Sequence, residues 1–131
     1  MSTAQTLRDD RLKKLDKIRE IGWNPYPSSY EKKQMISETR EMEGKEVKTA
    51  GKLYSFRTHG NIAFADLKDE TGKIQLFFKK DTLGAESYKQ LALLDIGDYV
   101  GVEGVVTKTT AGELSIMPSS YTLLSKSLQQ L

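Results

Sequence analysis

The 131-residue sequence predicts a mostly β protein: a small five-stranded barrel with an N-terminal α-helical extension and one helix between strands three and four. Two observations support this prediction. Between residues 47 and 117, segments that alternate apolar with polar residues recur, as half-buried strands do. Clusters of Gly, Asn and Asp separate these segments, and a stretch with helical spacing interrupts the series after the third one.

The predicted elements follow one another in a recognisable order. Strands one to three cover about residues 47–57, 62–69 and 73–79, joined by Thr58-His59-Gly60-Asn61 and Glu70-Thr71-Gly72. A short helix follows within residues 81–94, and strands four and five cover about residues 99–108 and 113–117, with residues 121–124 extending the last edge. This is the element order of the OB-fold, a Greek-key barrel that binds oligonucleotides over strands two and three. Another small barrel or a sandwich is the alternative.

The first 46 residues predict a helical extension. Apolar residues recur near helical spacing from residue 7 to 21, and Gly22 is a plausible stop: Leu7, Leu12, Leu15, Ile18 and Ile21. Basic residues outnumber acidic ones along this helix, so it either packs on a neighbour with a solvated face or lies along a phosphate backbone. Residues 23–27 are extended because of their two prolines, and residues 31–43 form a short helix or a loop.

Composition limits the function classes. The chain has no cysteine and one histidine, which excludes disulfides and thiolate metal sites and disfavours a His-based metal centre or a Ser-His-Asp site. No apolar run approaches the roughly 20 residues that span a membrane, and the first residues, MSTAQTLRDD, lack the apolar segment of a secretory signal. We therefore expect a cytoplasmic protein without a membrane partner. The net charge of +2 means that a nucleic-acid surface would be a local patch.

Strands two and three sort their side chains onto two faces. One face is apolar: Ala63, Ala65, Leu67, Ile74, Leu76 and Phe78. The opposite face combines aromatic, amide and charged groups: Ile62, Phe64, Asp66, Lys73, Gln75, Phe77 and Lys79. Rings stack on bases, amides read base edges and lysines meet phosphates, so this face suits single-stranded nucleic acid. The alternatives are an ordinary half-exposed sheet, or a Phe64 that in fact points into the core.

Five segments resemble the N-terminal anticodon-binding region of class II lysyl-tRNA synthetases. They are IREIGWNPYP (18–27), VKTAGKLYSFR (47–57), FADLKDETGKIQLFF (64–78), LDIGDYVGVEGVVTKTTAGELSI (94–116) and LLSKSL (123–128). Together they extend in order over nearly the whole chain. Aspartyl- and asparaginyl-tRNA synthetases share the barrel and the Arg…Phe…Gln arrangement, but the NPYP and GDYVGVEG runs are similar to the lysyl enzyme. Trp23 and Asn61 depart from the family pattern.

The resemblance implies roles for individual residues. It implies that Phe64 stacks on the central anticodon base, a uridine, that Gln75 reads the edge of this base, and that Arg57 completes its recognition. It also implies that Glu113 faces a neighbouring anticodon base. We expect further contacts from three residues on or beside the same strands: Phe77, Lys73 and His59.

The resemblance also implies a division of the chain. Residues 1–46 would be the helical extension, residues 47–128 the anticodon-binding domain, and residues 129–131 the start of a linker to a catalytic domain that this chain lacks. Enzymes of this family join lysine to tRNA with ATP and Mg²⁺ and are usually homodimers. We therefore expect this chain to bind the anticodon loop of tRNA(Lys), to have no catalytic, cofactor or metal site, and to be inactive as a ligase alone. A monomeric state of the isolated chain is compatible with the sequence.

Two other functions fit the residues. A general single-strand-binding OB domain would show little preference between anticodon sequences. A protein-interaction or dimerisation module would instead use the amphipathic N-terminal helix and the strand edges. A free-standing paralogue rather than part of a ligase is also compatible with the sequence.

Overall fold

The computed structural model describes residues 12–14, 16–18, 20 and 30–127. Three expectations fall at least partly outside these residues: the ends of the N-terminal helix with its stop at Gly22, the extended segment that contains Trp23, and the linker at residues 129–131. Residues 12–14, 16–18 and 20 are helical, as predicted. Ile18 is fully buried and Lys14 Nζ lies 2.7 Å from Asp95 Oδ1, which favours the packing role of this helix.

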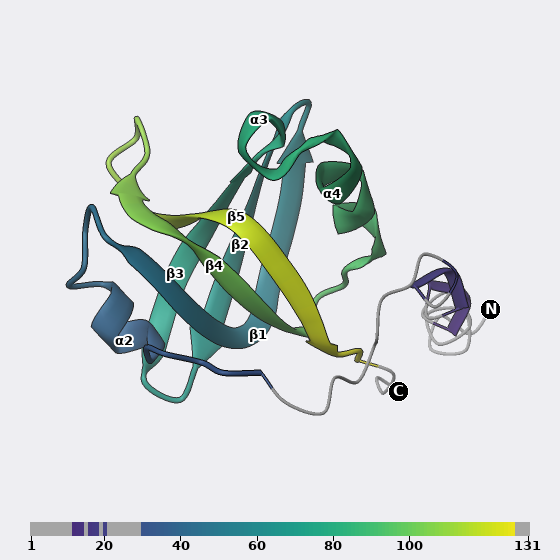
Figure 1. Cartoon of the computed structure of the whole chain (residues 1–131), viewed down its shortest axis with the longest axis horizontal. Coiled ribbons are helices and arrows are strands. Elements are labelled where there is room, and N and C mark those ends of the chain that lie inside the picture. Colours follow the sequence, from purple (N-terminus) through teal and green to yellow (C-terminus); the bar gives the residue numbers. More distant parts are fainter. Residues whose placement is uncertain (1–11, 15, 19, 21–29, 128–131) are drawn as a thin grey trace.

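Five strands close into a barrel, which confirms the predicted fold class (Figure 1). They are β1 (Glu46–His59), β2 (Ile62–Asp69), β3 (Gly72–Lys79), β4 (Tyr99–Lys108) and β5 (Leu114–Ser125). Their order around the barrel is β1-β2-β3-β5-β4, and β4 pairs with β1 to complete the circle. The β3–β5 pair is parallel and the others are antiparallel.

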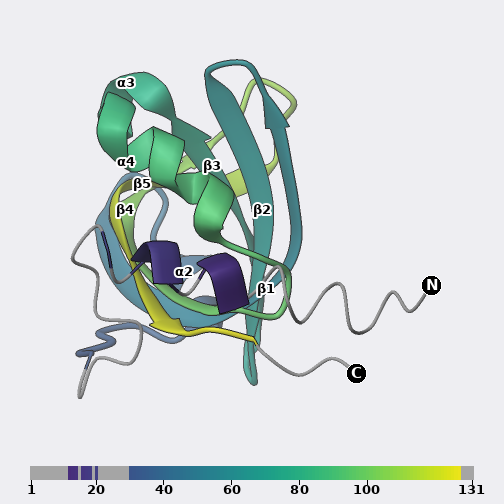
Figure 2. The same ribbon diagram turned by 90° about the vertical axis from the view of Figure 1, so that its right-hand side faces the viewer.

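The segment between β3 and β4 differs in detail from the single helix predicted. It consists of α3 (Lys80–Leu83), α4 (Ala85–Gln90) and the 3-10 turn η1 (Leu91–Leu93), which cover one end of the barrel (Figure 2). Gly84 separates the two helices because its φ of 94° does not continue an α-helix. The hydroxyl of Tyr88 donates to the carbonyl of Gly60 at 3.0 Å, so α4 lies beside the β1–β2 turn.

The structure defines two other predicted elements more closely. Residues 31–43, expected to form a short helix or a loop, contain the one-turn helix α2 (Ile36–Thr39). The last strand runs without a break from Leu114 to Ser125, through Pro118, instead of stopping at residue 117. A register shift of β4 against β5 accompanies Gly104, where an added Cβ would lie 2.1 Å from the carbonyl oxygen of Met117. The missing side chain is what allows the two strands to approach each other there.

The predicted apolar face lines the barrel interior. All six of its members are buried: Ala63, Ala65, Leu67, Ile74, Leu76 and Phe78. They join side chains from β1, β4 and β5, such as Leu53, Val100 and Ile116, in one hydrophobic core. The phase assigned to β2 and β3 is therefore confirmed, and Phe64 lies on the outer face.

A β-bulge at Tyr54 sets the phase of β1. Leu53 pairs with Leu67, but the next pair is Ser55 with Asp66, so Tyr54 is an extra residue without a register partner. Successive side chains of a strand point to opposite faces, and one inserted residue exchanges the faces from that point onward. Leu53 is buried in the core before the bulge, whereas after it Phe56 packs on the core and Arg57 is exposed. The bulge is thus what turns Arg57 outward.

A buried ion-pair network joins the end of β5 to the loop before β4. Lys126 Nζ lies 2.7 Å from Asp98 Oδ2 and 2.8 Å from Asp95 Oδ2, and the side chains of Lys126 and Asp98 have no exposed surface. Lys14 also pairs with Asp95. Burial alone would raise the pKa of Asp95, but its bonds to Lys126 and Lys14 lower it overall. The network ties three separate segments together.

A second buried carboxylate, Asp69, organises the segment before β1. Its side chain accepts hydrogen bonds from the Nζ of Lys32, the backbone N–H of Ile36, and the N–H and hydroxyl of Thr71. Burial alone would raise the pKa of Asp69, but these donors lower it well below its usual range. The carboxylate therefore holds α2 against the β2–β3 turn.

The pKa of Asp69 predicts a loss of stability in acid. Its unfolded-state pKa is near 3.9 and its folded-state pKa is lower, so its contribution is full above the unfolded value and is lost as the pH falls through the folded one. Urea unfolding of the wild type and Asp69→Asn between pH 6 and pH 3 should show the wild type losing its advantage toward pH 3. Because Asp95 remains in both proteins, a difference that stays constant with pH would contradict the role of Asp69.

Candidate nucleic-acid interface

The outer faces of β1, β2 and β3 carry the predicted site residues in successive cross-strand rows. The first row, next to the β1–β2 turn, is His59, Ile62 and Lys79. The second row is Arg57, Phe64 and Phe77. The third is Ser55, Asp66 and Gln75, and it continues onto β5 as Ser115. Cross-strand partners lie about 5 Å apart at Cβ, so each row can contact one ligand group.

The second row is a stack of flat groups. The rings of Phe64 and Phe77 are stacked, with centroids 5.1 Å apart and planes inclined by 11°. The guanidinium carbon of Arg57 lies 5.5 Å from the centroid of the Phe64 ring. Because β1 and β3 flank β2 on opposite sides, the two partners approach Phe64 from opposite sides. Both phenylalanines are half-buried and Arg57 is exposed, so ring and guanidinium surface remains open to a ligand.

The third row is polar. The hydroxyl of Ser55 donates to Asp66 Oδ2 at 2.7 Å, and Gln75 Nε2 donates to the hydroxyl of Ser115 at 3.0 Å. Ser115 is fully buried, whereas Gln75 is half-buried. Gln75 therefore has one end held by the protein, while part of its amide faces the solvent beside the aromatic row.

The remaining predicted residues lie around these two rows. Glu113 is exposed in the turn before β5, and its carbonyl accepts from the hydroxyl of Ser115 at 3.2 Å, so it lies close to Gln75. Lys73 is exposed and precedes Gln75 by two residues on the same face. His59 is exposed at the end of β1, in the row beyond Arg57. The structure thus brings all seven predicted residues to one side of the barrel.

This face is locally basic although the chain is nearly neutral. The cationic side chains Arg57, Lys68, Lys73 and Lys79 on the outer faces of these strands share it with the carboxylate of Asp66, and Glu113 adds a second carboxylate at its edge. A local positive patch attracts a phosphate backbone even where the net charge is small. The distribution matches the expectation that any nucleic-acid surface would be local.

Sequence reasoning did not assign roles to Ser55, Asp66 and Ser115. Strand alternation placed Asp66 beside Phe64, which was a usable signal. Ser115 carried none, because its partner Gln75 is 40 residues away and belongs to a strand that pairs with β5 over only two register positions.

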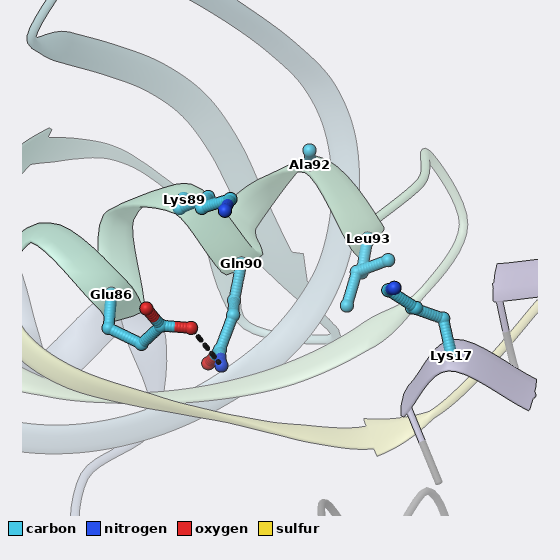
Figure 3. A pocket seen from close by; sticks show the side chains of 6 residues that line it. All are labelled: Lys17, Glu86, Lys89, Gln90, Ala92 and Leu93. Carbon is cyan, nitrogen blue, oxygen red and sulfur yellow. Dashed lines mark hydrogen bonds between the residues drawn. The ribbon is translucent and has the colours of Figure 1, made fainter. Parts of the chain in front are cut away.

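A hollow of about 370 Å³ lies elsewhere, between the N-terminal helix and the segment α4–η1 (Figure 3). It is lined by Lys17, Glu86, Lys89, Gln90, Ala92 and Leu93, and Glu86 accepts a hydrogen bond from Gln90 at 3.3 Å. None of the predicted site residues lines it. The candidate interface on the outer face of the strands is therefore separate from this hollow.

Two other features are absent from the described residues: a metal-binding cluster and a membrane-spanning helix. Within residues 12–14, 16–18, 20 and 30–127, no cluster of three or more His, Cys, Asp or Glu side chains could hold a metal ion. In the same part of the chain, no helix has the length and apolar character that crossing a membrane requires.

Comparison with known proteins places this face in a family. The family model described as an OB-fold nucleic acid binding domain, named tRNA anti-codon, matches residues 47–124. The lysine–tRNA ligase of Moorella thermoacetica is 42% identical over 125 residues, which cover 92% of this chain and 26% of that enzyme. The corresponding ligase of Carboxydothermus hydrogenoformans is 39% identical over 125 residues, with the same coverage.

A third relative shows similar identity and coverage. Lysine–tRNA ligase 2 of Methanosarcina acetivorans is 40% identical over 136 residues, covering 98% of this chain and 27% of that enzyme. The chain thus spans about a quarter of the length of the curated relatives that it matches. The closed barrel, its aromatic and polar outer face and the family match agree, and the chain belongs to the tRNA anti-codon family of OB-fold nucleic acid binding domains.

Proposed function

We propose that this chain recognises the anticodon loop of tRNA(Lys), as the anticodon-reading part of a lysine–tRNA ligase. The observation that carries the proposal is the pair of adjoining rows on the outer face. One row offers stacked rings and a guanidinium, and the other offers a half-buried amide. Similarity to lysine–tRNA ligases over more than nine-tenths of the chain supports the choice of tRNA(Lys).

In this proposal Phe64 is the platform for the central uridine of the anticodon. An aromatic ring under a base contributes about 1–3 kcal/mol to binding. Arg57 lies near the same ring, on the β1 side. A base that stacks there displaces the exposed guanidinium, which then lies at the rim of the base. Arg57 has only donors, so in its new place it binds a carbonyl oxygen of the base or a phosphate oxygen.

Gln75 reads the edge of the same base. Uracil offers an N–H donor between two carbonyl acceptors, and an amide has one acceptor oxygen and two N–H donors, so the two edges are complementary. Glu113 lies close by and accepts from the N–H groups of a neighbouring base. Lys73 and His59, at the two ends of the face, contact the backbone, and Phe77 extends the platform.

The proposal extends to the longer protein of which this family is normally a part. The ligase attaches lysine to tRNA(Lys) with ATP and Mg²⁺ bound in a separate catalytic domain, acts in the cytoplasm and forms a homodimer. We assign none of that chemistry to the residues described above. In this proposed division, residues 1–46 support the barrel, residues 47–128 bind the anticodon, and residues 129–131 belong to the linker toward the catalytic domain.

The direct test compares two RNA hairpins. The chain is titrated at moderate salt with a lysine-type anticodon stem-loop and with the same stem-loop in which the central uridine is cytidine. We expect tighter binding of the uridine form, because Gln75 is proposed to read the N–H and a carbonyl oxygen of uracil, and cytosine presents the inverse pattern. Light scattering of the free chain accompanies the titration.

Two outcomes would overturn the proposal in different ways. Equal binding of both hairpins, with strong salt dependence, would make the chain a general single-strand binder. A stable dimer without affinity for either hairpin would favour a protein-interaction module. The exposed side chains of Tyr54, Ile96 and Tyr99 are the surface that such a module would use.

A further inference from the structure

The Gln75 side chain is hydrogen-bonded to a side chain from another strand, that of Ser115. Its Nε2 lies 3.0 Å from Ser115 Oγ, across the parallel pair of β3 and β5. Ser115 is fully buried, so water has no access to its hydroxyl. The residue is thus a fixed part of the barrel wall, whereas the amide that it binds is half-exposed.

The proton of the Ser115 hydroxyl has a determined direction. Ser115 Oγ lies 3.2 Å from the carbonyl oxygen of Glu113, which accepts hydrogen bonds but cannot donate them. The one hydroxyl proton therefore points to Glu113, and Ser115 Oγ is left to accept from Gln75. Only the NH₂ end of the amide can serve as that donor, so the carbonyl oxygen of Gln75 points away from Ser115.

Rotation of the amide by half a turn would break this arrangement. The carbonyl oxygen of Gln75 would then face Ser115 Oγ, and a bond between them would need the proton that Glu113 receives. The carbonyl of Glu113 would keep its hydrogen bond from the backbone N–H of Thr109, at 3.0 Å, but would lose the one from Ser115. The rotated amide therefore costs one hydrogen bond.

We infer that Ser115 is a positioning residue that holds the Gln75 amide in one orientation and thereby sets the preference for uracil over cytosine. The inference rests on the proposed function. Uracil presents a ring N–H beside a carbonyl oxygen, whereas cytosine presents a bare ring nitrogen beside an amino group. The two patterns are inverse, and an amide that turns freely can match either one. An amide held by Ser115 matches uracil only.

The test is a double-mutant cycle with a specificity readout. Dissociation constants for the uridine and cytidine stem-loops are measured with the wild type, Ser115→Ala, Gln75→Ala and the double variant. Circular dichroism checks that each variant is folded at the assay temperature. One well-placed bidentate contact between a side chain and a base contributes at least about 1 kcal/mol to discrimination against the wrong base. We therefore expect Ser115→Ala to lower the ratio of the affinities for the uridine and cytidine stem-loops about fivefold or more.

The cycle separates positioning from a merely structural role. In the Gln75→Ala background, the Ser115 substitution should leave the ratio unchanged, since no amide remains to be oriented. Ser119→Ala is the matched control: it also removes a β5 hydroxyl that bonds to a backbone carbonyl, but at an exposed position, and it should not change the ratio. If Ser115→Ala does not fold, Ser115→Cys replaces it, because a thiol is a weak acceptor.

The outcomes distinguish this inference from the proposed function. A wild type that prefers uridine, with an unchanged preference in folded Ser115→Ala, would overturn the positioning role and leave anticodon reading intact. If Ser115→Ala lowered the uridine-to-cytidine ratio by the same factor in the Gln75→Ala background as in the wild type, Ser115 would act without Gln75. This outcome would also overturn the positioning role. A wild type without any preference would overturn both.

Discussion

Replacing Lys126 with Met is expected to lower the free energy of unfolding by about 3–5 kcal/mol, the usual cost of removing one partner from a buried ion pair. Met keeps most of the apolar stem but removes the ammonium group. Asp98, whose side chain has no exposed surface, would then retain a buried negative charge without its cation. Asp95 would keep only Lys14 as a partner. Urea unfolding followed by circular dichroism measures the loss.

Two further variants test whether charge is the cause. Lys108→Met changes an exposed lysine at the end of β4 and should alter stability by less than about 0.5 kcal/mol. Adding Asp98→Asn to Lys126→Met removes the unpaired charge. It keeps one acceptor oxygen, which can serve the N–H of Asp95, now bonded to Oδ2, or that of Ser127, now bonded to Oδ1, but not both. The double variant should be more stable than the sum of the single effects predicts. Strict additivity would mean that the two charges are not coupled.

Phe64→Ala is expected to weaken binding of the lysine-type anticodon stem-loop by about 1–3 kcal/mol, or about 5–150-fold. The substitution removes the ring on which the central base is proposed to stack. It also ends the stacking on Phe77 and removes the partner over which Arg57 lies. The barrel should remain folded because the Phe64 side chain is on the outer face, opposite the core residues Ala63 and Ala65. Fluorescence anisotropy of a labelled stem-loop measures the change.

The matched control is an exposed aromatic residue of the same sheet. Tyr54 lies at the bulge of β1, and Lys68 Nζ lies 5.1 Å from the centroid of its ring. Phe64 has a similar cationic neighbour in Arg57. Tyr54 is not a member of the two rows, so Tyr54→Ala should leave the affinity nearly unchanged. If both variants bound the stem-loop equally well in folded form, Phe64 would not be the platform.

The sequence predicted the strands and most of the face because alternation is a local signal. Phe64, Gln75 and Phe77 belong to β2 and β3, two regular strands without a bulge. Their common face follows from counting residues in steps of two. Arg57 was assigned to the same face only through family resemblance, since uninterrupted alternation from Leu53 would have turned it inward. The bulge at Tyr54 reverses the phase.

The features that the sequence could not predict depend on contacts between distant segments. The Lys126 network joins residues 14, 95, 98 and 126, and no local pattern marks any of them as buried. The same holds for the bond between Gln75 and Ser115, which exists because β3 and β5 become neighbours when the barrel closes. The apolar spacing that predicted the helix involves Tyr88, Leu91 and Leu94, which all follow Gly84, so it carried no sign of the break at this glycine.

The parallel pair of β3 and β5 is also the shortest ladder in the barrel, with two register positions, Gln75 with Ser115 and Leu76 with Ile116. A closed sheet opens most readily where the fewest bonds must break. Gln75, the residue proposed to read the base, therefore lies at the pair of strands that separates most readily. A nucleotide held there would oppose separation of β3 and β5. Binding is thereby linked to the stability of the closed barrel. An RNA that fits the site would raise the free energy of separating β3 from β5, the pair that is joined by the fewest register positions.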